Sequence, residues 1–265
     1  MADLPRTRDS LAHDLRTLGV AAGDVVLVHS SLRSLGWVCG GAVAVVQALL
    51  DALGPDGTLV VPTQSMNNSD PKLWSRPPVP ESWWPVIRAT MPAFDPRITP
   101  AEKLGVIPET VRTWPGAVRS NHPHTSFAAL GSRADALMAE HRLDSQLGEH
   151  SPLAALERAG AKVLLLGVGF DSCTAFHLAE YRVENPNRME YGCAMLDDQG
   201  NRVWRTYVDV ATNSERFGEL GESYLGTGTV TTGRVGDATC RLFPVDEAVA
   251  HAVDWLRRHE AAVTG

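Results

Sequence analysis

The chain has 265 residues, of which 44% are hydrophobic and 21% are charged, and its formal net charge is −7. This composition supports a sizeable buried core, so it excludes a disordered chain and a small scaffold that depends on disulfides or a structural metal. The acidic balance disfavours nucleic acid as a partner, because acidic surfaces repel phosphate backbones, whereas it is compatible with a cationic small molecule.

The first sixty residues predict a helix followed by a strand–helix–strand unit. Leucines at helical spacing predict a helix over 7–18, and the apolar run 25–28 predicts a strand buried on both faces. Gly40 and Gly41 precede a helix that ends at Leu53, and residues 58–62 (TLVVP) predict a second buried strand. Two strands joined by a helix favour a parallel pair with a right-handed crossover.

The segment 62–100 differs from the rest of the chain. It holds nine of the seventeen prolines and three of the seven tryptophans, and proline is poorly tolerated in helices and in central strands. We therefore expect a long irregular excursion. Long ordered loops in compact domains are commonly functional, and the alternative is a proline-stiffened cover over one edge of the core.

The second half of the chain predicts an alternation of helices and strands. Helices are expected at 132–143, 152–159, 174–181 and 246–260, a buried strand at 162–167, a β-hairpin at 195–207 and further strand at 229–243. This order predicts an α/β fold with a mixed, largely parallel central sheet that is flanked by helices.

Cysteine usage and hydropathy indicate the compartment. The four cysteines form no C-x-x-C pair, which favours reduced core residues over a zinc site. The N-terminus has no apolar signal core, and no window approaches the ~20 apolar residues that a membrane helix needs. We therefore expect a cytoplasmic protein without a membrane partner.

Two segments follow buried strands, where open α/β sheets bind ligands. The first is His29-Ser30-Ser31, whose hydroxyl and backbone N–H groups are suited to holding a phosphate, carboxylate or carbonyl oxygen. The alternative is that Ser30 and Ser31 only complete a turn.

The second segment, 167–180, begins with a glycine loop and continues into a helix. His177 and Glu180 are three residues apart and share one helix face, and a carboxylate that orients an imidazole is the arrangement of a general base. The alternatives are a surface His–Glu pair, a core histidine, or a nucleophilic pair of Cys173 with His177. The carboxylate of Asp171 would oppose thiolate formation at Cys173.

A third polar cluster lies at 119–127. His122 and His124 have a spacing that can ligate a metal on a strand, but Pro123 interrupts a regular strand and no carboxylate or H-E-x-x-H pattern accompanies them. A polar loop that binds substrate or coenzyme is favoured over a metal site. The absence of G-x-S-x-G disfavours an α/β-hydrolase.

Together the motifs resemble those of the aminoglycoside 3-N-acetyltransferases, the antibiotic N-acetyltransferase family that is distinct from the GNAT fold. The resemblance covers roughly residues 8–260. The four ordered motifs are H-S-S-L-R-S-L-G at 29–36, P-A-F-D-P-R-I-T-P at 92–100 with G-V-I-P-E at 105–109, R-S-x-H-P-x-x-S-F-A-A-x-G at 119–131, and L-L-L-G-V-G at 164–169 with T-x-x-H-x-A-E at 174–180. The resemblance implies one acetyltransferase domain over 1–265, with a cleft between two subdomains.

The resemblance also implies an activity and roles for residues. Acetyl-CoA would donate an acetyl group to an amine, in this family the 3-amino group of a 2-deoxystreptamine ring. His177 would be the general base and Glu180 its orienting partner. The coenzyme and its thioester would contact Ser30, Ser31, Leu32, Arg33, Ser120 and His122.

The residues agree with this chemistry. An ammonium must lose a proton before it can attack a thioester, and an imidazole is suited to removing it. We expect direct transfer in a ternary complex without a metal, and a Cys173 acyl-enzyme is the competing mechanism. A polycationic acceptor needs carboxylates, for which the candidates are Asp70, Asp171, Glu219 and Glu222.

Two other functions remain open at this point. One is an acetyl-CoA-dependent enzyme that acts on an amine other than an aminoglycoside. The other is a non-catalytic sensor of a cationic ligand, which the paired His177 and Glu180 disfavour. A homodimer is also left open.

Overall fold

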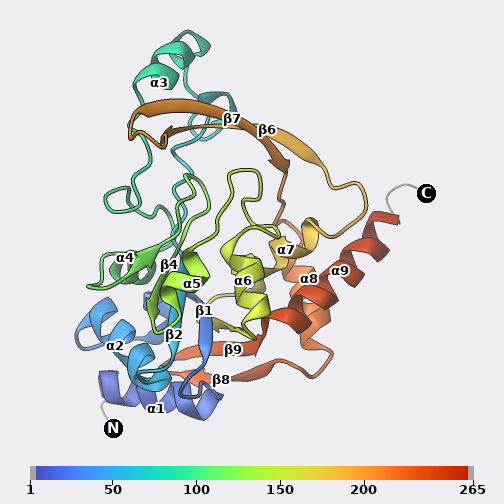
Figure 1. Cartoon of the computed structure of the whole chain (residues 1–265). Helices are drawn as coiled ribbons and strands as arrows, with labels where there is room; N and C mark the ends of the chain where they lie inside the picture. Colours follow the sequence, from blue (N-terminus) through green and yellow to red (C-terminus); the bar gives the residue numbers. More distant parts are fainter. Residues whose placement is uncertain (1–3, 262–265) are drawn as a thin grey trace.

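A mixed seven-stranded sheet forms the centre of the computed structural model, which describes residues 4–261. Its strands are β1 (Val25–Ser30), β2 (Thr58–Pro62), β3 (Val118–Arg119), β4 (Phe127–Gly131), β5 (Lys162–Leu166), β8 (Thr231–Val235) and β9 (Ala238–Pro244). They lie in the order β3-β4-β2-β1-β5-β9-β8 (Figure 1). The predicted mixed sheet is confirmed.

The parallel part of the sheet is smaller than expected. Strand β1 pairs in parallel with β2 and with β5, whereas β4, β3, β9 and β8 extend the sheet by antiparallel pairing. The expectation of a largely parallel sheet therefore holds for the three central strands only. The predicted strand at 229–243 is in fact the hairpin β8–β9, and such a short turn can join only antiparallel strands.

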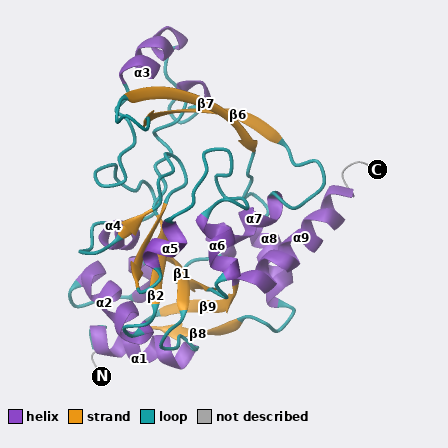
Figure 2. Cartoon of the chain, viewed as in Figure 1, coloured by secondary structure: helices purple, strands orange, loops and turns teal. Residues whose placement is uncertain are grey.

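The central strands are buried on both faces, as their continuous apolar runs predict. In β1, Val25 and Leu27 join one hydrophobic cluster, whereas Val26 and Val28 join the other. Side chains alternate between the two faces of a strand, so both faces of the sheet need a covering layer. The helices between residues 8 and 53 and the one at 106–112 cover one face, and the helices from residue 134 onward cover the other (Figure 2).

The α-helices account for most of this covering layer. They are α1 (Arg8–Leu18), α2 (Gly41–Leu53), α3 (Trp84–Thr90), α4 (Val106–Arg112), α5 (Ala134–Met138), α6 (Pro152–Arg158), α7 (His177–Glu180), α8 (Phe217–Leu225) and α9 (Val245–Ala261). Short 3-10 turns occur at Leu32–Leu35, Pro71–Leu73, Glu81–Trp83, Phe170–Ser172 and Thr174–Phe176. Within residues 4–261, no helix is long and apolar enough to cross a membrane.

A second, two-stranded sheet lies at the end of the molecule beside α3 (Figure 1). It consists of β6 (Arg188–Leu196) and β7 (Arg202–Val210), so the predicted hairpin is confirmed and its strands are longer than expected. The 62–100 excursion packs on it, because the Asn68 side chain bonds both backbone groups of Ala194. Asp209 accepts hydrogen bonds from Gln146 N and the Tyr181 hydroxyl, which connects β7 to the main body.

The helix expected at 132–143 is wrong beyond Met138, where α5 ends. His141 lies 2.9 Å from the Ser120 hydroxyl through Nδ1 and 2.7 Å from the Gln146 carbonyl through Nε2. These tertiary contacts hold the segment in an irregular path and override its helical propensity.

Candidate active site

A cleft of about 610 Å³ lies at the carboxyl edge of the three parallel strands. It is lined by 29–33 after β1, by Pro62 and Gln64 at the end of β2, and by residues of the 168–177 segment after β5. The segment 103–108, which leads into α4, forms a further wall. This is the crevice in which open α/β sheets bind ligands, and its size is ordinary for a small-molecule site.

The His177–Glu180 pair predicted from spacing is present, and His177 lines the cleft. His177 Nδ1 donates to Glu180 Oε2 at 2.6 Å, and the two side chains are 14% and 12% exposed. Glu180 Oε1 accepts a further hydrogen bond from Asn213 N at 2.7 Å, and Phe217 packs against the imidazole. The carboxylate therefore fixes the tautomer that carries its proton on Nδ1, which leaves Nε2 available to accept a proton.

The segment after β1 contributes several polar groups. Ser30, Ser31, Leu32 and Arg33 all line the cleft. Ser31 accepts a hydrogen bond from the Ser34 hydroxyl. The Ser30 hydroxyl is buried and has no hydrogen-bond partner within the described chain. Because buried polar atoms are nearly always paired, an unpartnered hydroxyl in a residue that lines a cleft is a candidate donor for a ligand oxygen.

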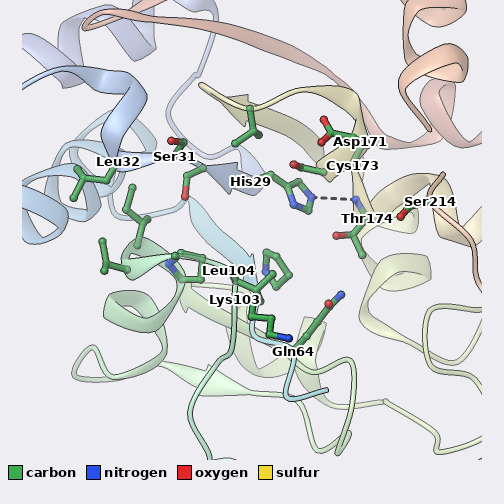
Figure 3. A pocket seen from close by; sticks show the side chains of 18 of the residues that line it. His29, Ser31, Leu32, Gln64, Lys103, Leu104, Asp171, Cys173, Thr174 and Ser214 are labelled. Atoms are coloured by element: carbon green, nitrogen blue, oxygen red, sulfur yellow. Dashed lines mark hydrogen bonds between the residues drawn. The ribbon is translucent and has the colours of Figure 1, made fainter. Parts of the chain in front are cut away.

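Two further cleft residues were missed by the sequence analysis. His29 is 5% exposed and lies between Ser31 and Thr174 (Figure 3). The sequence placed it in the polar segment after the strand at 25–28, but its side chain was given no role. Lys103 lies beside Gln64 (Figure 3) and has a left-handed backbone with φ +59°. A left-handed non-glycine residue in a loop leaves no periodic signal in the sequence, although this conformation is uncommon enough to mark functional positions.

The acidic candidates do not gather in the cleft. Asp171 lines it, but Asp70 is buried and paired with Arg88 at 2.8 Å. Glu219 pairs with Arg216 at the surface of α8, and Glu222 is exposed on the same helix. The structure therefore does not bring Asp70, Glu219 and Glu222 together with Asp171, because each faces a different environment.

Ser120 and His122 also lie outside the cleft lining. Both are fully buried, and His122 Nδ1 accepts hydrogen bonds from the backbone N–H groups of His124 and Thr125. We call His122, His124 and His141 the buried histidine cluster. Burial lowers the pKa of all three and brings that of His141 to about 4.

The competing nucleophile is poorly placed to ionise. Cys173 is fully buried at the back of the cleft, and burial raises the pKa of its thiol to about 12. In the part of the chain that the structure describes, no three His, Cys, Asp or Glu side chains form a group that could hold a metal ion.

Comparison with known proteins identifies relatives over nearly the whole length. The family model for aminoglycoside 3-N-acetyltransferase matches residues 27–257. The SPbeta prophage-derived aminoglycoside N(3')-acetyltransferase-like protein of Bacillus subtilis is 45% identical, over 97% of this chain and 94% of that protein. Aminoglycoside N(3)-acetyltransferase VIII of Streptomyces fradiae is 38% identical, over 98% of this chain and 95% of that protein.

Solved structures agree with this relationship. The crystal structure of the same Bacillus subtilis protein matches with a TM-score of 0.96, over 98% of this chain and 96% of that one. AAC-IIIb in a binary complex with CoASH has a TM-score of 0.86 at 32% identity, over 97% and 98% of the two chains. AAC-VIa bound to sisomicin also has a TM-score of 0.86, at 33% identity over 97% and 99%.

Proposed function

Because the chain belongs to the aminoglycoside 3-N-acetyltransferase family, and is thus an acyltransferase, we propose that it transfers an acetyl group from acetyl-CoA to an amine of an aminoglycoside. The acceptor would be the 3-amino group of a 2-deoxystreptamine ring. The observation that supports this most directly is the cleft-lining His177, whose Nδ1 is held by Glu180 so that Nε2 is available as a base.

Acetyl-CoA fits the segment after β1. AAC-IIIb, a relative of this chain, binds CoASH. The buried hydroxyl of Ser30 has no hydrogen-bond partner among residues 4–261, and a coenzyme oxygen would accept its hydrogen bond. Arg33 and Lys103 bring positive charge to the cleft, and the phosphates of the coenzyme are the anions of this reaction. Ser31 and Leu32 complete this side of the site.

The acceptor amine would lie on the side of His177 and Asp171. AAC-VIa, a relative, binds sisomicin, and the Asp171 carboxylate lines the cleft where it can attract an ammonium group. Asp70, Glu219 and Glu222 take no part in this proposal, because their positions lie away from the cleft lining.

His177 would act twice in the reaction. The acceptor reacts as the neutral amine, after its ammonium form has lost one proton to solvent. The Nε2 of His177 then removes a second proton from the nitrogen as it attacks the thioester carbonyl carbon, and the carbonyl π electrons move onto oxygen. When the tetrahedral intermediate collapses, the carbonyl re-forms, the C–S bond breaks, and the leaving sulfur of coenzyme A receives the proton from His177. Glu180 stabilises the imidazolium that exists between the two steps.

Direct transfer is favoured over an acyl-enzyme. A nucleophilic Cys173 would need its thiolate, and burial raises the pKa of that thiol to about 12. Both substrates would instead be bound together, and their alignment contributes much of the rate. We further propose that residues 1–265 function as one acetyltransferase domain in the cytoplasm, with coenzyme A and a cationic amine as its partners and no metal.

The charges of the cleft also support a second acceptor class. Among the residues that line the cleft, the lysines, arginines and carboxylates are Arg33, Lys103 and Asp171. Two positive charges therefore face one negative charge. A polycation is attracted less strongly by such a cleft than an amine with one positive charge. Acetyl transfer to a non-aminoglycoside amine is therefore the alternative.

A thiol-release assay tests the proposal. The protein is mixed with acetyl-CoA and a panel of gentamicin-type and kanamycin-type aminoglycosides and simple amines, and the wild type is compared with His177→Ala. Release of CoA with an aminoglycoside, lost in the variant, is the expected result. Release with simple amines only would favour the second acceptor class, and release that survives the substitution would contradict the role of His177.

A further inference from the structure

We propose that His29 is a second catalytic residue, whose Nδ1–H donates a hydrogen bond to the thioester carbonyl oxygen as negative charge develops on it. This inference rests on the proposed acetyl transfer and adds a donor to it. His29 lies near the carboxyl end of β1, opposite Leu165 of β5, and it lines the cleft. It is thus on a rigid element and not on a mobile loop.

The hydrogen bonds of His29 determine its tautomer. Thr174 N donates to His29 Nε2 at 3.4 Å (Figure 3), so Nε2 is an acceptor. In a neutral imidazole the other nitrogen then carries the proton. No residue in the described part of the chain accepts a hydrogen bond from Nδ1. A donor left unpaired in a buried ring is costly, and a ligand oxygen in the cleft would satisfy it.

The surroundings of His29 keep the ring neutral. Burial and the nearby His177 together lower its pKa to about 3. A neutral ring can stand beside His177 when His177 becomes positively charged, whereas a second imidazolium would be repelled. His29 therefore acts as a fixed dipole that is already oriented before the reaction, which is the property of an effective oxyanion donor.

Two variants separate this role from a structural one. In His29→Asn the amide nitrogen stands near the position of Nδ1, so a donor is retained. In His29→Gln the amide oxygen reaches the position of Nε2, so the hydrogen bond from Thr174 N is retained without that donor. We expect kcat to fall about 100-fold to 1000-fold in His29→Gln, because losing one oxyanion donor costs about this much. In His29→Asn, which keeps a donor in altered geometry, we expect kcat to fall only about 10-fold.

The division of the effect between kcat and KM is as informative as the size of the loss in kcat. The KM values for acetyl-CoA and for the amine are expected to stay within about 3-fold, since the hydrogen bond to the uncharged ground-state carbonyl adds little to binding and strengthens mainly as charge develops in the transition state. If His29→Gln is as active as His29→Asn or more active, His29 serves to hold Thr174 and the inference is wrong. His13→Gln, at an exposed position of α1, controls for the loss of a histidine elsewhere.

A measurement without an acceptor separates this inference from the choice of amine. Acetyl-CoA labelled with ¹³C at the thioester carbonyl is bound to each variant, and its carbonyl stretch is recorded by isotope-edited infrared spectroscopy. We expect a lower frequency in the wild type and His29→Asn than in His29→Gln. Equal frequencies in all three would overturn the role of His29 even if aminoglycosides are acetylated. The expected shift in a protein that acetylates no aminoglycoside would leave it standing and contradict only the acceptor.

Discussion

The molecule holds two groups of histidines that differ in how many of their ring nitrogens have hydrogen-bond partners in the protein. In the cleft, His29 and His177 each use one ring nitrogen for the protein, at Thr174 N and Glu180 respectively. In the buried histidine cluster, both nitrogens of each ring have partners within the protein. Each cleft histidine thus keeps one ring nitrogen that can bond a ligand, whereas the histidines of the buried cluster bond protein groups through both nitrogens.

The cluster shows how completely a buried imidazole can be satisfied. His122 bonds the backbone N–H groups of His124 and Thr125 and the Leu143 carbonyl. His124 bonds the Asn68 carbonyl and the Tyr207 hydroxyl. His141 bonds the Ser120 hydroxyl and the Gln146 carbonyl. These contacts join the main sheet to the excursion and to the small sheet. The comparison teaches that hydrogen-bond completeness, more than burial, distinguishes the cleft histidines from those of the buried histidine cluster.

The largest expected effect is a loss of kcat on substitution of a cleft histidine, which the buried histidine cluster should not show. His177→Ala should lower kcat about 1000-fold, because general-base catalysis contributes about 10²–10⁴, and it should barely change the midpoint of thermal unfolding. Glu180→Gln keeps a hydrogen-bonding group and should lose less, about 10-fold to 100-fold. A loss below 10-fold in His177→Ala, measured by thiol release, would break the comparison.

Acid should affect the cluster before it affects most carboxylates. Burial holds the pKa of His141 at about 4, below the ~6.5 of an unfolded histidine, so the unfolded state binds more protons between these values. The stabilisation is present above pH ~6.5 and is lost as the pH falls towards 4, by about 3 kcal/mol for this residue. Urea unfolding at pH 7, 5.5 and 4.5 measures it. A flat profile would contradict the neutral cluster.

A substitution within the cluster should change stability without changing the chemistry. His141→Leu removes one of the hydrogen-bond partners of the Ser120 hydroxyl and one of those of the Gln146 carbonyl, so we expect a loss of about 2 kcal/mol and a Tm lower by about 5 °C. The kcat of the folded fraction should stay within about 2-fold. The acid sensitivity of unfolding should also decrease, and an unchanged pH profile would assign that sensitivity to other groups.

The cationic side of the cleft offers a smaller test. Lys103→Gly removes a charge and also suits the left-handed backbone, so stability should be maintained. We expect the KM for acetyl-CoA to rise about 10-fold, the scale of one lost charged contact to a phosphate. With acetyl-pantetheine, which lacks the diphosphate and the 3'-phosphate, the variant and wild type should be equal. An equal loss with both donors would place Lys103 elsewhere in the reaction.

The smallest expected effect is at the buried thiol. Cys173→Ala should keep kcat within about 3-fold, because the pKa of this thiol, about 12, leaves it protonated. Intact-protein mass spectrometry after mixing with acetyl-CoA alone should show no acetylated enzyme. An acetyl adduct that is lost in the variant would restore the acyl-enzyme mechanism.

The sequence predicted the parts of this molecule whose signals are local. Apolar runs identified β1, β2 and β5, and the three-residue spacing of His177 and Glu180 predicted their contact, which is confirmed at 2.6 Å. The residue roles themselves stay predictions until the variants above are measured.

Signals that depend on tertiary contacts were missed. Asp70 could not be recognised as the partner of Arg88, eighteen residues away across an irregular excursion. Likewise, the third motif gave no indication that Ser120 and His122 would be enclosed by the 141–147 segment. His29 was placed in the polar segment that follows the predicted strand at 25–28, but its imidazole was given no role, because the sequence does not show that it contacts Thr174 N.

The register of the central strands has a consequence for synthesis. His29 lies opposite Leu165, so the cleft joins the first strand of the chain to one made in its second half. Loop closure over such a separation is slow, and β1 cannot bury both faces until β5 has left the ribosome. Until then the nascent chain exposes apolar strands that are prone to aggregate. Translation rate and chaperone supply are therefore expected to govern the yield of active enzyme.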